Sequence, residues 1–423
     1  MKRLLFIIAL LIPATSFAKI YIPVNQPSDE KFPIAICDLN YSDGKNIAEV
    51  IRNDMMLSGY FNVFSPESTK EVEKSEGKDS DQINFDKWRQ IDALALVKGK
   101  IVKESQGKLT VSLRLYDSLA GEMLVGKEYQ AGKDQIREVA HRFSDEIMLA
   151  LTGISGVFNT KIAYVAPEKK NRKEIAVMDM DGYGSWLVTK NKSINISPAW
   201  SPDGGSLAFT SYANGTPELY LKKLGGNNMT RVTSSEGANL TPAFSPTGDK
   251  ILFASSRTSD TELYLASPRG KGVKQITNSF GIDISPSWSP GGQEFVFASD
   301  RTGKLHLYSM NLSGSFPLRL TFVGYQNDMP AWSPVGDKIA FAGRDMGAFD
   351  IFIMNPDGSN IQRLTIGSGN NENPTWSPDG RWIAFSSTRE GGSAIYIMRA
   401  DGSNQVRVSK GGGILPDWGP KRQ

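Results

Sequence analysis

Ser197-Pro-Ala-Trp-Ser-Pro-Asp-Gly204 is the stretch that decides the fold, because close copies of it follow at a nearly constant interval. The copies are Thr241-Pro-Ala-Phe-Ser-Pro-Thr-Gly248, Ser285-Pro-Ser-Trp-Ser-Pro-Gly-Gly292, Met329-Pro-Ala-Trp-Ser-Pro-Val-Gly336, Asn373-Pro-Thr-Trp-Ser-Pro-Asp-Gly380 and, truncated, Leu415-Pro-Asp-Trp-Gly-Pro420. Their aromatic residues, Trp200, Phe244, Trp288, Trp332, Trp376 and Trp418, are 44, 44, 44, 44 and 42 residues apart. A repeat of this length, built of short strands, is typical of a β-propeller blade.

Each repeat predicts four strands. The aromatic residue lies on the first strand, and Ser-Pro-Asp-Gly supplies the proline and glycine of a tight turn. A short apolar run such as Ile251-Leu-Phe-Ala-Ser follows, as expected for a strand buried on both faces. A third strand, such as Glu262-Leu-Tyr-Leu, leads through a glycine turn to a fourth that ends at Arg-Val-Thr or a similar triplet.

The two ends of the repeat region predict how the ring closes. Lys161-Ile-Ala-Tyr-Val165 matches the second strand of a blade that lacks its first strand, and Leu415–Pro420 is a first strand without a blade. We therefore expect an all-β six-bladed β-propeller closed by pairing of the C-terminal strand into the first blade, which leaves no long sheet edge exposed. Deleting the last ten residues should open this ring.

The N-terminus carries the pattern of a secretory signal peptide. Lys2-Arg3 precede an apolar run from Leu4 to Ile12, and Ser16-Phe17-Ala18 has small residues where a signal peptidase cuts. The run is about half of the roughly 20 apolar residues that a membrane span needs. We predict a signal peptide over residues 1–18 and a secreted mature protein without membrane insertion.

Residues 19–152 predict a compact α/β domain, ahead of a short linker at 153–158 and the propeller at 158–423. Helical periodicity occurs at Asp43–Gly59 and Asp134–Leu151. Strand-like runs occur at 61–64, 94–102, 109–116 and 123–129. The charged segment 70–82 is interpreted as a mobile loop.

Cleavage after Ala18 would make residues 19–28 the new N-terminus. Apolar residues alternate in this segment as they would in a strand, but Pro23 and Pro27 confine it to a sheet edge or a detachable extension. One interpretation is an ordinary edge strand. The other is a partner-binding segment (19–30) that adds to a partner's sheet through Lys19, Ile20, Tyr21, Ile22, Pro23 and Val24.

The sequence lacks the usual marks of catalysis. It has two histidines, His141 and His306, no Gly-x-Ser-x-Gly elbow and no phosphate-binding Gly-x-x-x-x-Gly-Lys motif. Cleavage after Ala18 leaves 46 basic against 45 acidic residues, which argues against nucleic acid as a partner. We expect a protein that is not an enzyme and holds no cofactor or metal, with the single Cys37 in a core.

Strand direction predicts a polar rim at one end of the ring. The residues before each first strand and those after each second strand share that end, because the two strands are antiparallel. The candidate partner-binding residues are Asn195, Ser197, Ala238, Asn239, Thr241, Asp283, Ser285, Asn327, Asp328, Asn371 and Asn373, with Arg257, Arg301, Arg344 and Arg389. A structural interpretation stays open, in which these are polar loop residues and the arginines pair with acids of neighbouring blades. As a set they are suited to bind a peptide or a protein loop.

From end to end the chain resembles the TolB family, periplasmic components of the Tol-Pal system of Gram-negative bacteria. The resemblance includes Asn62-Val-Phe64, Leu151-Thr-Gly-Ile-Ser-Gly-Val-Phe158, Asp181-Gly-Tyr-Gly184 and the order of the parts. It implies a periplasmic, non-enzymatic adaptor whose propeller mouth binds the lipoprotein Pal and whose mature N-terminus binds TolA, supporting outer-membrane integrity and constriction at division.

The resemblance carries three further expectations. Pal contacts of the family map here to 238–241 and 283–285, where this chain has Ala238-Asn-Leu-Thr241. Other outer-membrane or peptidoglycan-associated proteins are further candidate partners. Release of the N-terminal segment would alter Pal binding.

Two other classes of protein fit the repeats. A solute- or glycan-binding propeller would use exposed aromatic residues, with Tyr325 and Phe280 as the main candidates on this rim. A regulatory propeller of a hydrolase would need a separate catalytic chain.

Overall fold

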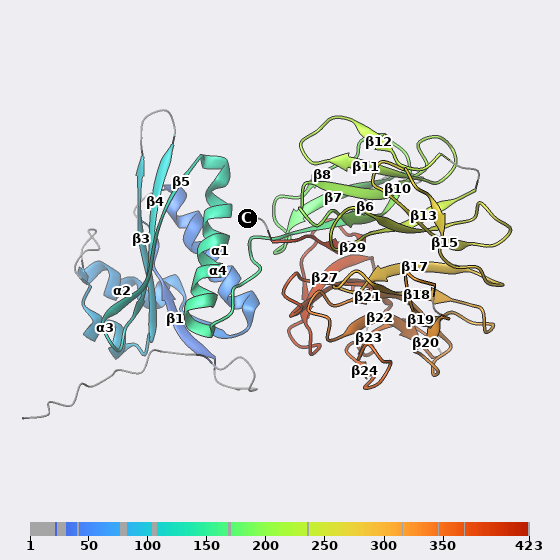
Figure 1. Ribbon diagram of the computed structural model, residues 1–423. Helices are drawn as coiled ribbons and strands as arrows, with labels where there is room; N and C mark the ends of the chain where they lie inside the picture. Colours follow the sequence, from blue (N-terminus) through green and yellow to red (C-terminus); the bar gives the residue numbers. More distant parts are fainter. Residues whose placement is uncertain are drawn as a thin grey trace, which may run out of the picture. The chain divides into compact units, whose positions relative to one another are not determined.

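The computed structural model forms two units, Met1–Gly156 and Val157–Gln423 (Figure 1). It describes residues 22, 31–39, 42–76, 83–103, 108–167, 171–234, 237–314, 316–345, 347–367 and 369–421. The predicted signal peptide and the N-terminal segment, apart from Ile22, lie outside these residues. No helix in these ranges combines the length and the apolar character needed to cross a membrane.

The first unit is an α/β domain around a five-stranded sheet in the order β2-β1-β3-β4-β5. The strands β1, β2 and β3 are parallel, whereas β3, β4 and β5 are antiparallel. The helices α1 and α4 pack against each other through apolar residues at helical spacing. Its elements are β1 (Phe32–Ile36), α1 (Ser42–Ser58), β2 (Phe61–Val63), α2 (Pro66–Glu76), α3 (Phe85–Gln90), β3 (Ala95–Lys103), β4 (Leu109–Asp117), β5 (Glu122–Ala131), η2 (Lys133–Gln135) and α4 (Ile136–Thr152).

The prediction of a mobile loop over residues 70–82 is wrong for its first half. Helix α2 continues to Glu76, and residues 77–82 lie outside the described ranges. Glu76 accepts a hydrogen bond from Trp88 Nε1 at 2.9 Å and forms a buried ion pair with Lys98. These contacts with distant parts of the chain hold a helix that its own low apolar content does not predict. Cys37 lies in the adjoining buried cluster, as expected.

The second unit contains six four-stranded sheets, which are the blades of the propeller. Every blade is an antiparallel meander, and the strand with the repeat aromatic residue, Trp or Phe, lies at one edge of its sheet, next to the second strand as predicted. The blades are β29 (Ile414–Trp418), β6 (Lys161–Pro167), β7 (Lys173–Asp179) and β8 (Trp186–Leu187); β9 (Asn195–Trp200), β10 (Ser206–Ser211), β11 (Glu218–Lys223) and β12 (Met229–Arg231); β13 (Asn239–Phe244), β14 (Ile251–Ser255), β15 (Glu262–Ala266) and β16 (Lys274–Gln275); β17 (Asp283–Trp288), β18 (Glu294–Ser299), β19 (His306–Asn311) and β20 (Leu318–Arg319); β21 (Gln326–Trp332), β22 (Ile339–Arg344), β23 (Asp350–Met354) and β24 (Gln362–Arg363); and β25 (Asn371–Trp376), β26 (Trp382–Ser387), β27 (Ala394–Arg399) and β28 (Val406–Arg407).

The C-terminal strand closes the ring, which confirms the prediction. Strand β29 pairs antiparallel with β6, with Trp418 opposite Ile162 (Figure 1). The indole Nε1 of Trp418 donates to Thr160 Oγ1 at 2.9 Å. The first blade is therefore built from both ends of the propeller sequence.

Each first strand contains a β-bulge at the residue three before its aromatic position. Ser197 at this position has φ of 52°, and the register shifts there in every blade. The equivalent residues Thr241, Ser285, Met329, Asn373 and Leu415 have φ between 47° and 57°. None is glycine, so this left-handed backbone is held by the surrounding sheet.

The core lies between neighbouring blades. Apolar side chains of the second and third strands pack with the aromatic residue of the next blade, as in the cluster of Leu252, Trp288 and Phe297. The indole Nε1 of Trp288 also donates to the carbonyl of Ala243 across this boundary at 3.0 Å. The repeat aromatics thus join one blade to the next.

Candidate functional site

One end of the propeller gathers the predicted arginines, and we call this end the arginine rim. It consists of the starts of the first and third strands and the ends of the second and fourth strands. The pairing of Asn239 with Ser255, and of Ser255 with Glu262, places these ends together in one blade. The loop from each fourth strand to the next blade lies at the same end.

The arginines of the rim are half-buried and held by their own blades. Arg301 Nε donates to Ser299 Oγ at 2.8 Å, and its Nη2 donates to both carboxylate oxygens of Asp283. Its guanidinium lies over Phe297 and Tyr308, at 5.4 and 4.9 Å from the ring centroids. These contacts hold the guanidinium in one orientation.

The other three arginines vary this arrangement. Arg257 and Arg389 make the same ring contacts, but their Nη2 atoms donate to amide oxygens of Asn239 and Asn371. Arg344 instead donates to Gln326 and lies over the rings of Tyr325 and Phe349. These hydrogen bonds go to residues of the same blade, whereas acids of the preceding blade, Glu218 and Asp350, act on Arg257 and Arg389 through their charge alone.

The predicted residues at the start of each first strand are buried. Asn195, Asn239, Asp283 and Asn371 are 0% exposed and Asn327 is 5% exposed. Asn371 Nδ2 donates to Asp350 Oδ1 of the preceding blade at 3.0 Å, and Thr365 Oγ1 donates to the same oxygen at 2.7 Å. The same three-residue network joins Glu174, Thr189 and Asn195, and Glu218, Thr233 and Asn239. These side chains connect blades, so they shape the rim from beneath.

Two blade boundaries change the charge of this network. At one, Glu262 faces Asp283, and burial together with that second carboxyl raises the pKa of Glu262. At the next, His306 replaces the acid and contacts Thr321 and Asn327. Burial lowers the pKa of His306, so the neutral imidazole is favoured at this internal position.

The remaining predicted residues differ in exposure. Asp328 is buried, and desolvation raises the pKa of its carboxyl. Ala238 and the bulge residues Ser197, Thr241, Ser285 and Asn373 are partly exposed. These positions and the arginines are the predicted residues that keep exposed surface.

The sequence indicated Phe280 and Tyr325 as exposed aromatic residues on this rim, but not Phe322, Val323 and Ile366, which extend them into one apolar surface. Phe280 is 94% exposed, Phe322 71%, Val323 68% and Ile366 74%, and Tyr325 is half exposed. All lie in the loops that lead from a fourth strand into the first strands of three consecutive blades. The equivalent loops of other blades carry Lys190 and Lys410. Comparing these loops across repeats would have revealed the difference.

The N-terminal segment is described at a single residue. The backbone N–H of Ile22 donates to the carbonyl of Leu151 at 2.7 Å, within the last turn of α4. The carbonyls of a last helical turn lack partners inside the helix, so this contact satisfies one of them. The other predicted residues of the segment, Lys19, Ile20, Tyr21, Pro23 and Val24, lie outside the described residues.

These observations define a protein with an α/β domain followed by a closed six-bladed β-propeller. The family of the TolB amino-terminal domain matches residues 20–124, and that of the TolB beta propeller domain matches 149–345 and 323–422. The chain belongs to the TolB family.

Individual proteins similar to this chain are also TolB proteins. The Tol-Pal system protein TolB of Hydrogenovibrio crunogenus is 34% identical over 221 residues, and that of Desulfosudis oleivorans is 36% identical over 240 residues. These alignments cover 50% and 54% of this chain and the same shares of the relatives, so the chain spans about half the length of the relatives it matches. The crystal structure of TolB from Acinetobacter baumannii is 29% identical, with a TM-score of 0.82 over 93% of this chain and 98% of that one.

Proposed function

We propose that this protein is a periplasmic adaptor of the Tol-Pal system that carries out no catalysis and binds the lipoprotein Pal at the arginine rim. The observation that carries the proposal is the group of exposed apolar side chains beside fixed arginines on that rim. Membership of the TolB family supports the proposal that the protein acts in the Tol-Pal system.

The chemistry of the rim suits a protein partner. Exposed aromatic residues and arginines are the side chains that contribute most to protein–protein affinity. Arg344 contacts the rings of Tyr325 and Phe349 and donates to Gln326, so little side-chain freedom is lost when it is covered. Phe280 and Phe322 offer the apolar area that would anchor the partner.

The second part of the proposal is that the mature N-terminus binds TolA. Segment 19–30 would act as an added strand, and the Ile22 contact with α4 is one bond that such an exchange would break. The two contacts together would let the protein link Pal to TolA and support outer-membrane integrity and constriction during division.

Titration of the mature protein with a soluble Pal domain from the same organism tests the rim. The double variant Phe322→Ala/Tyr325→Ala should weaken binding about 30-fold or more, because the proposal makes these exposed aromatic residues anchors of the interface. The asparagines beneath the rim are poor targets, since their replacement would remove a hydrogen bond from a buried acid and so change the stability of the fold.

Phe316→Ala is the matched control for this titration. Phe316 is 99% exposed and precedes β20 of the same blade, in the turn at the other end of the strands. It should leave Pal affinity unchanged. Equal binding by wild type and the double variant would place the Pal site elsewhere, and binding of Pal by neither would reject the adaptor function.

Deleting residues 19–28 tests the N-terminal segment. The truncated protein should lose TolA binding, and its Pal affinity should differ from that of the full mature chain if the two sites are coupled. Retained TolA binding would reject the assignment of this segment. Unchanged Pal affinity would reject the coupling.

A further inference from the structure

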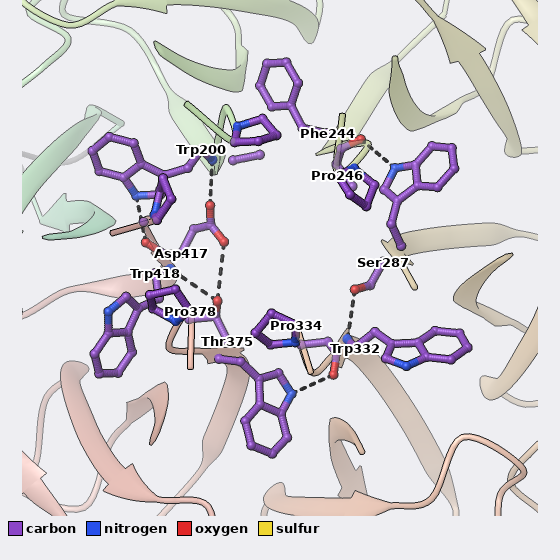
Figure 2. Close-up of a pocket in the computed structure, with 18 of the residues that line it drawn as sticks. Trp200, Phe244, Pro246, Ser287, Trp332, Pro334, Thr375, Pro378, Asp417 and Trp418 are labelled. Carbon is purple, nitrogen blue, oxygen red and sulfur yellow. Dashed lines mark hydrogen bonds between the residues drawn. The ribbon is translucent and has the colours of Figure 1, made fainter. Parts of the chain in front are cut away.

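The opposite end of the propeller contains a cavity whose walls come from every blade. It has a volume of about 490 Å³ and is formed by the first strands and the tight turns that follow them. Twelve of its lining residues are prolines, among them Pro246, Pro334 and Pro378, which surround the opening in Figure 2. We call this cavity the proline mouth. Proline rings give it rigid walls, whereas the indoles point away from the opening and are buried between the blades (Figure 2).

A single charged side chain faces this cavity among the described residues that line it, namely that of Asp417. The equivalent position of the other repeats is Ala199, Ala243, Ser287, Ala331 and Thr375. Asp417 lies on the closing strand β29, half-buried, between Trp200 and Thr375 (Figure 2). Its Oδ2 accepts the backbone N–H of Trp200 at 2.7 Å, and its Oδ1 accepts Thr375 Oγ1 at 3.4 Å.

The carboxylate has no counter-ion in the lining. Removal from water raises the pKa of Asp417 to about 7, against the lowering effect of the two hydrogen bonds. The strands packed against β29 carry few titratable groups, and none of these lines the cavity: Lys161 and Tyr164 on β6, Glu372 on β25, and Tyr396 and Arg399 on β27. Lys161 is paired with Asp179.

We propose that the proline mouth binds a primary ammonium group, presented as a lysine side chain by a polypeptide partner, with Asp417 as its counter-ion. A carboxylate that faces a cavity with no cation in its lining attracts a cation from outside. Each oxygen of Asp417 already accepts one hydrogen bond, which leaves one acceptor direction on each, and the planar fork of a guanidinium would have to match both remaining directions at once. A compact ammonium can pair with the carboxylate through either remaining direction alone, and its methylene chain would lie against the prolines.

The test uses the full mature chain and two small probes, Nα-acetyl-lysine N-methylamide and its neutral norleucine analogue. Binding is followed through the indole N–H signals of Trp200 and Trp418, because Trp200 Nε1 donates to the Asp417 carbonyl at 3.0 Å. The lysine probe should shift these signals saturably, with an affinity at least tenfold above that of the norleucine probe. Asp417→Asn should remove that difference while retaining cooperative unfolding.

The pH dependence of probe binding gives a second test that needs no variant, because only the ionised form of Asp417 pairs with the ammonium group. Since Asp417 has a pKa of about 7, its ionised fraction rises from about one tenth to about nine tenths between pH 6 and pH 8. Affinity for the lysine probe should rise about tenfold across this range, and binding at pH 7 should release about half a proton. Equal affinities for the two probes, absence of saturable shifts, or an affinity independent of pH would each overturn the proposal. The result of this test is independent of the Pal titration, because the variants used there lie on the arginine rim at the other end of the propeller.

Discussion

Removal of the closing strand is the sharpest test of how this propeller is held together. A chain that ends at Gly413 lacks all of β29, whereas one that ends at Pro420 retains it. The first truncation exposes the edge of β6 and opens the boundary between the first and last blades. The second removes only residues 421–423.

The size of the effect follows from the contacts that are lost. Trp418 is 6% exposed, and deletion of a buried tryptophan side chain costs about 3–5 kcal/mol. The hydrogen bonds from Trp200 Nε1 to the Asp417 carbonyl and from Trp418 Nε1 to Thr160 contribute about 1 kcal/mol each. The loss of about 5–7 kcal/mol is comparable to the whole stability of a typical domain, about 5–15 kcal/mol.

Thermal and urea unfolding of both truncations measure this effect. The chain ending at Gly413 should unfold at a much lower temperature, or without a cooperative transition, and the chain ending at Pro420 should resemble the mature protein. Full cooperative stability of the shorter chain would show that closure by β29 does not hold the ring.

Three further outcomes are expected from other parts of the structure. Arg301→Ala leaves the buried Asp283 carboxylate without its cation, so urea unfolding should show a loss of about 3–5 kcal/mol, exceeding that of Arg257→Ala, where the partner left behind is a neutral amide. Gly182→Ala places a Cβ 1.9 Å from a backbone carbonyl oxygen at a left-handed φ of 83°, and should lower the melting temperature of the propeller by several degrees. The Asp417 pKa of about 7 in the folded state lies above its usual unfolded value near 3.9, so stability should fall as pH rises from about 4 to 7 and level off above; unfolding of Asp417→Asn across that range should lack this slope.

The repeat made the propeller predictable from the sequence. The aromatic period gave the number of blades, and the unmatched strand at Leu415–Pro420 gave the closure that β29 and β6 confirm. These features are local, because the Ser-Pro-Asp-Gly turn and the apolar run after it fix two paired strands without help from distant residues. The helices α1 and α4 were equally clear from their periodicity.

Other features depend on contacts between distant residues. Helix α2 is held by Trp88 and Lys98 through Glu76, which its own sequence does not reveal. Each bulge residue precedes a proline and has a left-handed backbone. A residue other than glycine disfavours this conformation by itself, so the surrounding sheet imposes it.

The rim shows the same division between local pattern and tertiary structure. Strand direction alone placed the arginines and asparagines at one end of the ring, because antiparallel neighbours must share their ends. Burial could not be predicted in the same way: Asn371 is covered because a carboxylate 21 residues earlier, Asp350, crosses the blade boundary to meet it. The sequence determined which residues lie at each end of the propeller, and the packing of blade against blade decided which of them a partner can reach.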